Sequence, residues 1–135
     1  MPSSQINSEA QQINDLSRKV LDAAMIVHTA LGPGLLESAY EHCLLYELRK
    51  HGIHAMTQVQ LPIIYDNQHI DAGYRIDMLV ENRIIVELKA VERLLPIHEA
   101  QLLSYLKLAD KRLGLLINFN ISQLRHGIKR MVNDF

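Results

Sequence analysis

The sequence predicts a single α/β domain in which a mixed sheet is flanked by helices. Apolar residues recur at helical spacing in three segments, and β-branched or continuous apolar runs between them indicate strands. The length of 135 residues suits one domain, and a hydrophobic content of 48% is sufficient for a packed core. The predicted order is α, α, β, β, β, α, β and a terminal element, which corresponds to an α/β sandwich.

Residues 1–12 are polar and rich in Ser, Gln and Asn, with few apolar side chains that could pack against a core. Such a segment buries too little surface to become ordered, so we expect a flexible N-terminal arm. The single domain then spans residues 13–135. Its first element is a helix of about five turns, because apolar residues recur at steps of three and four between Ile13 and Leu31.

A turn follows this helix at Gly32, Pro33 and Gly34, since glycine permits left-handed backbone and proline cannot continue a helix. A second helix is predicted over residues 35–51. Glu37 lies in its first turn, where an acid complements the helix dipole. The same acid stands beside a turn whose glycines let backbone approach a ligand closely. The sequence leaves both interpretations open.

Three strands are predicted to form a meander over residues 59–65, 70–80 and 83–91. Pro62 lacks a backbone donor, so the first strand belongs at an edge or carries a bulge. The second and third strands are separated only by a short polar turn. These three strands therefore form one antiparallel part of the sheet.

A helix over residues 96–109 and a buried strand over residues 113–119 come next. Pro96 suits a first helical turn, and a short apolar run between polar residues indicates a buried strand. A helix precedes this strand, so the strand is a candidate for parallel pairing with an earlier one through a right-handed crossover. Residues 124–132 fit either a helix or a strand, and the sequence leaves that choice open.

Residues 75–89 form the central stretch of the chain and indicate a β-hairpin. A turn centred on Asn82, which tolerates left-handed backbone, places Asp77 opposite Glu87. Side chains on a strand alternate, so Glu87 and Lys89 point to the same face. Two acids directly opposite each other destabilise a hairpin, and a divalent cation between them would remove that penalty.

A different interpretation of these charges is a solvated ion pair on an exposed strand. The surrounding residues favour burial instead, because the strand after the turn is apolar on both faces and is therefore expected to be central in its sheet. Charges in such a strand are seldom left without a partner.

The composition excludes several classes of protein. A formal net charge of -1 means that no global basic field attracts nucleic acid, so binding of nucleic acid would depend on a local patch or a metal. Cys43 is the single cysteine, which excludes a disulfide framework and a cysteine-ligated cluster. The sequence shows no membrane span and no signal-peptide pattern, so a cytoplasmic location is the default expectation.

Several motifs occur in order along the chain. They are Val27-His28-x-x-Leu31-Gly32-Pro33-Gly34, Gly34-x-x-Glu37-x-x-Tyr40, Asp77 with Glu87-x-Lys89, and Gln101-x-x-x-Tyr105. The first two resemble the GxxExxY proteins, a family similar to the PD-(D/E)xK nuclease-like superfamily. The third resembles the motif of that superfamily, with Ile76 where the motif has proline, and the last resembles its RecB-like branch.

The resemblance implies a nuclease-like α/β sandwich with a catalytic centre on the hairpin. Asp77 and Glu87 would bind magnesium or manganese, with Glu37 as an auxiliary acid ligand. Lys89 would orient the attacking water or stabilise the charge that develops on phosphorus. Hard, oxygen-ligated cations and a nearby lysine suit phosphodiester hydrolysis.

The resemblance also implies roles for residues outside the hairpin. Gln101 and Tyr105 would contact the nucleic-acid backbone or position Lys89. Accessory candidates are His28, Tyr40 and Arg75, and Gly32 and Gly34 would form a backbone turn near the site. His28 has a second interpretation, as a side chain that complements the dipole at the end of its helix.

The expected function is metal-dependent hydrolysis of nucleic acid, with DNA favoured over RNA. The alternative is a nuclease-like fold without turnover that acts as a binding module or partner subunit for nucleic acid or protein. Because the net charge is near neutral, a lone monomer is not expected to bind nucleic acid tightly, and a homodimer or a larger partner would supply the missing affinity.

Overall fold

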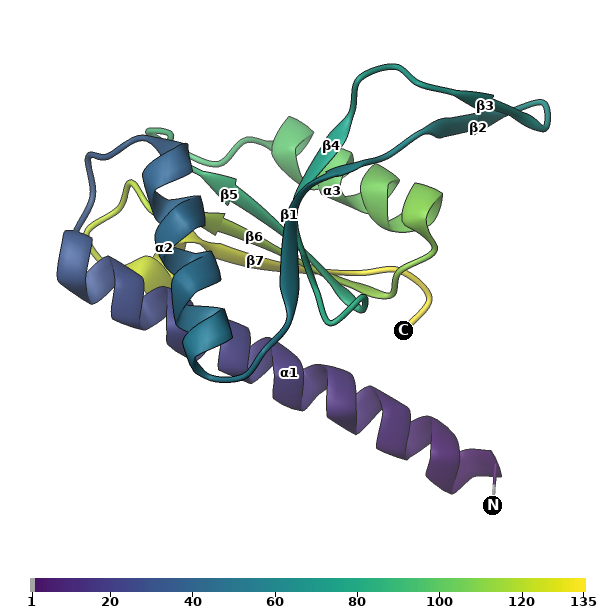
Figure 1. Ribbon diagram of the computed structural model, residues 1–135, viewed down its shortest axis with the longest axis horizontal. Coiled ribbons are helices and arrows are strands. Elements are labelled where there is room, and N and C mark those ends of the chain that lie inside the picture. Colours follow the sequence, from purple (N-terminus) through teal and green to yellow (C-terminus); the bar gives the residue numbers. More distant parts are fainter. Residues whose placement is uncertain (1) are drawn as a thin grey trace.

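The computed structural model describes residues 2–135, with side chains described from residue 8 onward. A five-stranded sheet forms the middle layer, and a separate two-stranded hairpin projects from it (Figure 1). The elements are α1 (Pro2–Leu31), α2 (Glu37–Lys50), β1 (Ala55–Gln60), β2 (Ile63–Tyr65), β3 (Gln68–Ile70), β4 (Arg75–Val80), β5 (Ile84–Lys89), α3 (Pro96–Ala109), β6 (Leu113–Asn118), the 3-10 helix η1 (Leu124–Gly127) and β7 (Ile128–Val132).

The sheet is mixed, as predicted, with strand order β1-β4-β5-β6-β7. Strands β5 and β6 pair in parallel across the α3 crossover, and the other neighbouring pairs are antiparallel. The central position of β5 agrees with its apolar character on both faces. This α/β architecture is consistent with a PD-(D/E)xK nuclease-like fold.

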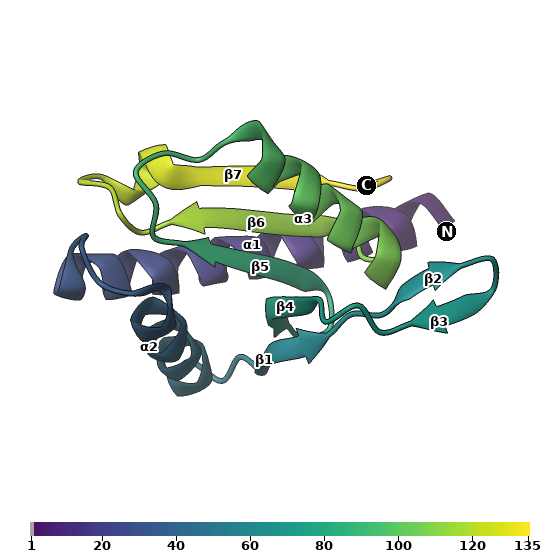
Figure 2. The ribbon, with the colours of Figure 1, turned by 90° about the horizontal axis from the view of Figure 1, so that it is seen from above.

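Helices α1 and α2 cover one face of the sheet, and α3 covers the other (Figure 2). On the first face, Val20 of α1 and Leu44 of α2 belong to one buried cluster with Val86 of β5. On the second face, Leu102 and Leu106 of α3 belong to another cluster with strand residues of β4, β5 and β6. Two cores thus hold the central hairpin from both sides. Among the described residues, no helix has the length and apolar character that a bilayer-spanning segment requires.

The N-terminal segment contains the start of the first helix, and the flexibility of the arm over residues 1–12 stays a prediction. Its backbone is helical from Pro2, so α1 begins well before Ile13. Proline fits the first turn of a helix, and the following Gln, Glu and Ala residues favour helix over coil. A scarcity of apolar residues does not by itself end a helix. Met1 lies outside the described residues.

The predicted strands over 59–65 and 70–80 are each divided in the structure. After β1 the chain leaves the sheet, forms the β2–β3 hairpin, and returns at β4. Gly73 marks the return with φ +82°, a left-handed conformation that glycine adopts without strain. The β2–β3 hairpin, residues 63–70, is called the β-arm below.

The C-terminal element combines two structures. Residues 124–127 form the short helix η1, and residues 128–132 form β7 at the sheet edge beside β6. Of the two structures that the sequence left open, the strand therefore forms over most of this segment. The bounds of α3 are those predicted, 96–109, and Asp110 ends the helix in a left-handed conformation with φ 54°.

Candidate functional site

The central feature of the site is a pair of acids on adjacent strands. Backbone pairing between β4 and β5 runs from Val80 and Ile84 to Met78 and Val86, in the predicted register. At the next position the two strands are joined by hydrogen bonds to the carboxylates of Asp77 and Glu87.

Each of these acids accepts a hydrogen bond from the other strand. The Asp77 N–H donates to Glu87 Oε2 at 2.8 Å, and the Leu88 N–H donates to Asp77 Oδ2 at 2.9 Å. These two bonds fix both carboxylates beside each other in the sheet. The hairpin register therefore brings Asp77 and Glu87 together, as the sequence indicated.

Burial controls the protonation of this pair. Glu87 is 5% exposed, and burial, followed by the charge of Asp77, raises its pKa to about 8. The pKa of Asp77 is also raised, mainly by burial, although its hydrogen bond from Leu88 opposes the shift. Near neutral pH the Glu87 side chain is therefore largely protonated. The pair is an unfavourable place for two negative charges without a counter-ion.

Lys89 lies two residues beyond Glu87 on β5. Its ammonium group lowers the pKa of both acids, although burial outweighs that effect. The end of β5 is held firmly, because the Phe119 N–H donates to the Lys89 carbonyl at 2.9 Å. The buried Asn118 side chain adds bonds to the backbone of Val91, accepting at 3.1 Å and donating at 2.9 Å.

Asn118 was missed by sequence reasoning. It is the last residue of the buried apolar strand β6. A polar side chain at a buried position needs hydrogen-bond partners, and that requirement could have indicated its bonds to a neighbouring backbone.

Helix α2 brings two more acids toward the pair. The charge of Glu41 raises the pKa of both Asp77 and Glu87. The charge of Glu37 contributes only to the raised pKa of Asp77, and its contribution is the smallest. Gln58 of β1 holds Glu41, donating from Nε2 to its two carboxylate oxygens at 3.0 and 3.3 Å. Glu41, one helical turn beyond Glu37, is thus the acid of α2 with the larger electrostatic influence on the site.

The ligand set predicted from Asp77, Glu87 and Glu37 is not assembled in the structure. Among the side chains that it describes, no three Asp, Glu, His or Cys residues are grouped so as to hold a metal ion. Glu37 is exposed at the first turn of α2. Its role as a ligand stays a prediction. The spacing of four residues between Glu37 and Glu41 placed both on one helix face and could have indicated Glu41 from the sequence.

Gln101 and Tyr105 of α3 lie at the same site. Gln101 Nε2 donates to the Tyr105 hydroxyl at 3.0 Å. Tyr105 is buried, and its pKa is raised first by that burial and then by the charge of Glu87. The i, i+4 spacing links the two side chains on one face of α3, and Tyr105 lies close enough to feel the charges of Glu87 and Asp77. The roles of Gln101 and Tyr105 in the site stay predictions. Tyr74, which sequence reasoning missed, meets the Tyr105 ring edge-on, with 6.0 Å between ring centroids.

Tyr40 fixes the Gly-Pro-Gly turn. Its hydroxyl donates to the Gly32 carbonyl at 2.6 Å and accepts from the Leu35 N–H at 3.1 Å. Its ring stacks on Phe119, with centroids 4.6 Å apart and planes 14° apart. Gly32 and Gly34 both have positive φ, 68° and 104°. The side chain thus holds the turn that leads into the helix carrying Glu37 and Glu41.

Tyr40→Phe is expected to lower the free energy of unfolding by about 0.5–1.5 kcal/mol, because it removes two partly buried hydrogen bonds. Tyr46 is 66% exposed on the same helix, and Tyr46→Phe is the matched control. Its expected change is within about 0.5 kcal/mol. Urea denaturation of both variants tests this role, and equal stabilities would contradict it.

The other accessory candidates have mainly structural contacts. His28 is buried, and its Nε2–H donates to the Ile121 carbonyl at 2.7 Å, which connects the end of α1 to the segment after β6. Arg75 is exposed, and its Nη1 donates to the Tyr74 carbonyl at 3.0 Å. These contacts do not bring either side chain to the acid pair.

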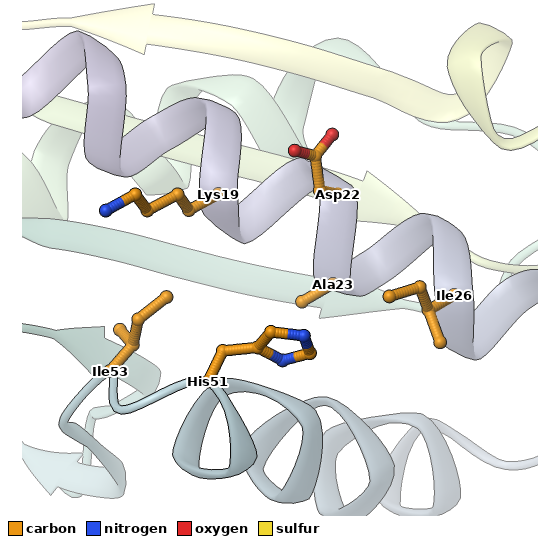
Figure 3. Close-up of a pocket in the computed structure, with 6 residues that line it drawn as sticks. All are labelled: Lys19, Asp22, Ala23, Ile26, His51 and Ile53. Carbon is orange, nitrogen blue, oxygen red and sulfur yellow. The ribbon is translucent and has the colours of Figure 1, made fainter.

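A separate hollow of about 290 Å³ lies between α1 and the end of α2. Figure 3 shows His51 and Ile53 facing Ala23 and Ile26 of α1 across it. None of the candidate site residues lines it.

Comparison with known proteins agrees with this geometry. The model of the PD-(D/E)XK nuclease superfamily matches residues 14–131, nearly the whole chain. No curated protein and no solved structure gave a significant match. The matched region includes both strands of the acid hairpin and the helices that surround it. The chain therefore belongs to the PD-(D/E)XK nuclease superfamily.

Proposed function

We propose that this protein is a divalent-metal-dependent nuclease that hydrolyses phosphodiester bonds at the Asp77–Glu87 pair. The observation that carries the proposal is the pair itself: two carboxylates fixed beside each other in a central hairpin, with raised pKa values and a lysine two residues away. Two acids face one nearby cation, and without a metal the raised pKa of Glu87 lets a proton offset the second negative charge. A metal ion would replace that proton and allow both acids to be ionised.

The donor chemistry of the pair fits magnesium or manganese. Carboxylate oxygens are the ligands that these hard cations prefer, and a cation would favour the ionised form of Glu87. When bound, such an ion supplies charge neutralisation at phosphate and a nucleophile near neutral pH. The residues that would hold it are Asp77 and Glu87. Glu37 and Glu41 are candidates for additional, outer contacts.

The remaining residues have roles that follow from their positions. Lys89 would stabilise negative charge on the phosphate through its ammonium group. Gln101 and Tyr105 would orient the nucleic acid, a role supported by the bond between them and by the effect of the Glu87 charge on Tyr105. A preference for DNA over RNA, a cytoplasmic location, a homodimer and membership of the GxxExxY and RecB-like groups stay predictions.

Lys89→Met tests turnover separately from metal binding, because methionine keeps much of the side-chain length and removes the charge. We expect cleavage of labelled nucleic acid in Mn²⁺ to fall by about 10²- to 10³-fold, the range for losing one electrostatic contact in a transition state. Calorimetric Mn²⁺ binding should persist. The control is Lys107→Met, an exposed lysine of α3.

The alternative of a binding module without turnover predicts a different result. The unmutated protein would then cleave neither single- nor double-stranded DNA or RNA in Mg²⁺ or Mn²⁺. That outcome would overturn the proposed hydrolysis. Equal cleavage by the Lys89 and Lys107 variants would overturn the role given to Lys89.

A further inference from the structure

A second hollow lies between α3 and the segment that carries the β-arm. It has a volume of about 420 Å³, within the range of about 300–1,000 Å³ that is usual for small-ligand pockets. Ile63 of the β-arm and Tyr74 line one side, and Ile97, Ser104 and the Gln101–Tyr105 pair of α3 line the other. Figures 1 and 2 show the β-arm leaving the sheet beside α3. Tyr105 belongs both to this hollow and to the surroundings of Glu87.

The lining of this hollow is mainly aromatic and apolar, with His98, Gln101 and Ser104 as its polar members. It contains no aspartate, glutamate, lysine or arginine, and the His98 Nδ1 accepts from the Leu95 N–H at 3.0 Å. Tyr74 is 42% exposed and meets Tyr105 only edge-on, so it offers aromatic surface for a further ring. The Tyr74 carbonyl accepts from the Leu61 N–H at 3.0 Å, which fixes the backbone that carries this ring. The Ser104 hydroxyl and the Gln101 side-chain oxygen add groups that hydrogen-bond a polar ring edge.

The exposed aromatic ring favours an unpaired strand over a duplex as the occupant. Phosphate contacts use basic side chains with either form of nucleic acid, and this chain has only 14 Lys and Arg against 15 Asp and Glu, so affinity has to come from other contacts. The hollow itself carries none of these charges. Stacking of an unpaired base on an aromatic ring is independent of such an excess and tolerates any sequence. A base within a duplex does not expose its face in this way.

We propose that this hollow binds an unpaired base of a single-stranded nucleic acid next to the phosphate that is cleaved, with Tyr74 as the stacking surface. The proposal rests on the proposed function, since it names the substrate class of the same site. DNA and RNA share the base chemistry that the hollow recognises.

Binding without hydrolysis tests this proposal. The probes are fluorescein-labelled single strands of DNA and RNA, the paired DNA duplex, and single strands that lack one base at successive positions. Fluorescence anisotropy in EDTA measures affinity while cleavage is prevented. We expect the single strands to bind more tightly than the duplex. Removing one base should weaken binding at a defined position.

Tyr74→Leu removes the aromatic face and keeps an apolar side chain of moderate size. We expect it to lower single-strand affinity by about tenfold or more, as loss of one stacking contact does. Tyr65 is 71% exposed on the β-arm and does not line the hollow, so Tyr65→Leu is the matched control and should bind like the unmutated protein. The unmutated protein should bind the strand that lacks a base more weakly than the intact strand. Tyr74→Leu should bind the two strands with nearly equal affinity.

A second pair of variants keeps the test decisive if Tyr74→Leu does not fold. Ile97 is 67% exposed in the hollow, and Ile26 is 46% exposed in the separate hollow between α1 and α2 (Figure 3). Ile97→Glu should weaken single-strand binding, and Ile26→Glu should not.

Two results would overturn the proposal: tighter or equal binding of the duplex, or equal affinities of the variants and their controls. These results are separable from the fate of the nuclease proposal. Hydrolysis with a preference for duplex would contradict the proposed base site and support the proposed nuclease activity. Specific single-strand binding without hydrolysis in any divalent metal would support the base site and contradict the nuclease activity.

Discussion

Asp77→Asn is expected to reduce metal-dependent hydrolysis by about 10³-fold or more, the largest effect of any single change in the site. The substitution removes one of the two carboxylates that would hold the metal. Asparagine has nearly the same shape, and its side-chain oxygen can still accept the hydrogen bond that the Leu88 N–H donates to Asp77 at 2.9 Å. The fold should therefore be retained. Cleavage of a labelled strand in Mn²⁺ measures the loss.

The same variant should be more stable than the unmutated protein when no metal is present. The charge of Asp77 is the second cause of the raised pKa of Glu87, so removing that charge lowers the pKa of Glu87 and relieves the repulsion. Asp22→Asn, at an exposed position of α1, is the matched control. Full cleavage by Asp77→Asn, with metal present, would contradict the role of this residue.

Glu87 is expected to make stability depend strongly on pH in metal-free buffer. Its pKa is raised from 4.5 to about 8 in the folded protein. The folded state therefore holds a proton that the unfolded chain loses above pH 4.5, so the unfolded chain binds fewer protons between these values. The free energy of unfolding should then fall as pH rises from 4.5 to about 8, by up to about 1.4 kcal/mol per pH unit.

Glu87→Gln should remove this part of the pH dependence, because glutamine does not ionise. Its side-chain oxygen can still accept the bond from the Asp77 N–H. The measurement is urea denaturation of both proteins in EDTA across this pH range, and the difference between the two curves isolates Glu87 from the histidines. Parallel curves for the two proteins would show that Glu87 is not protonated in the folded state.

The sequence was most informative about the central hairpin. A turn at Asn82 fixes the pairing of Val80 with Ile84, and from that register the meeting of Asp77 and Glu87 follows by counting. The bounds of α3 were also accessible, because a proline at its start acts locally. Such features depend on residues that are close in the chain.

Other features depend on contacts between distant segments. The division of the predicted strands arises where the Leu61 N–H bonds to the Tyr74 carbonyl, which closes the base of the β-arm. The contact between Gln58 and Glu41 joins β1 to α2. Alternation and helical spacing describe one element at a time, so they reveal neither contact. The alternation around Tyr74 predicted a strand there, whereas Tyr74 lies in the connection between β3 and β4.

Calorimetric titration with Mn²⁺ near neutral pH tests most directly whether the Asp77–Glu87 pair is a metal site. Because the pKa of Glu87 is about 8, metal binding should release a proton, and the heat should depend on the ionisation enthalpy of the buffer. We expect saturable binding with proton release in the unmutated protein and loss of both in Asp77→Asn. Absence of binding, or binding that is the same in Asp77→Asn, would contradict a metal site at this pair.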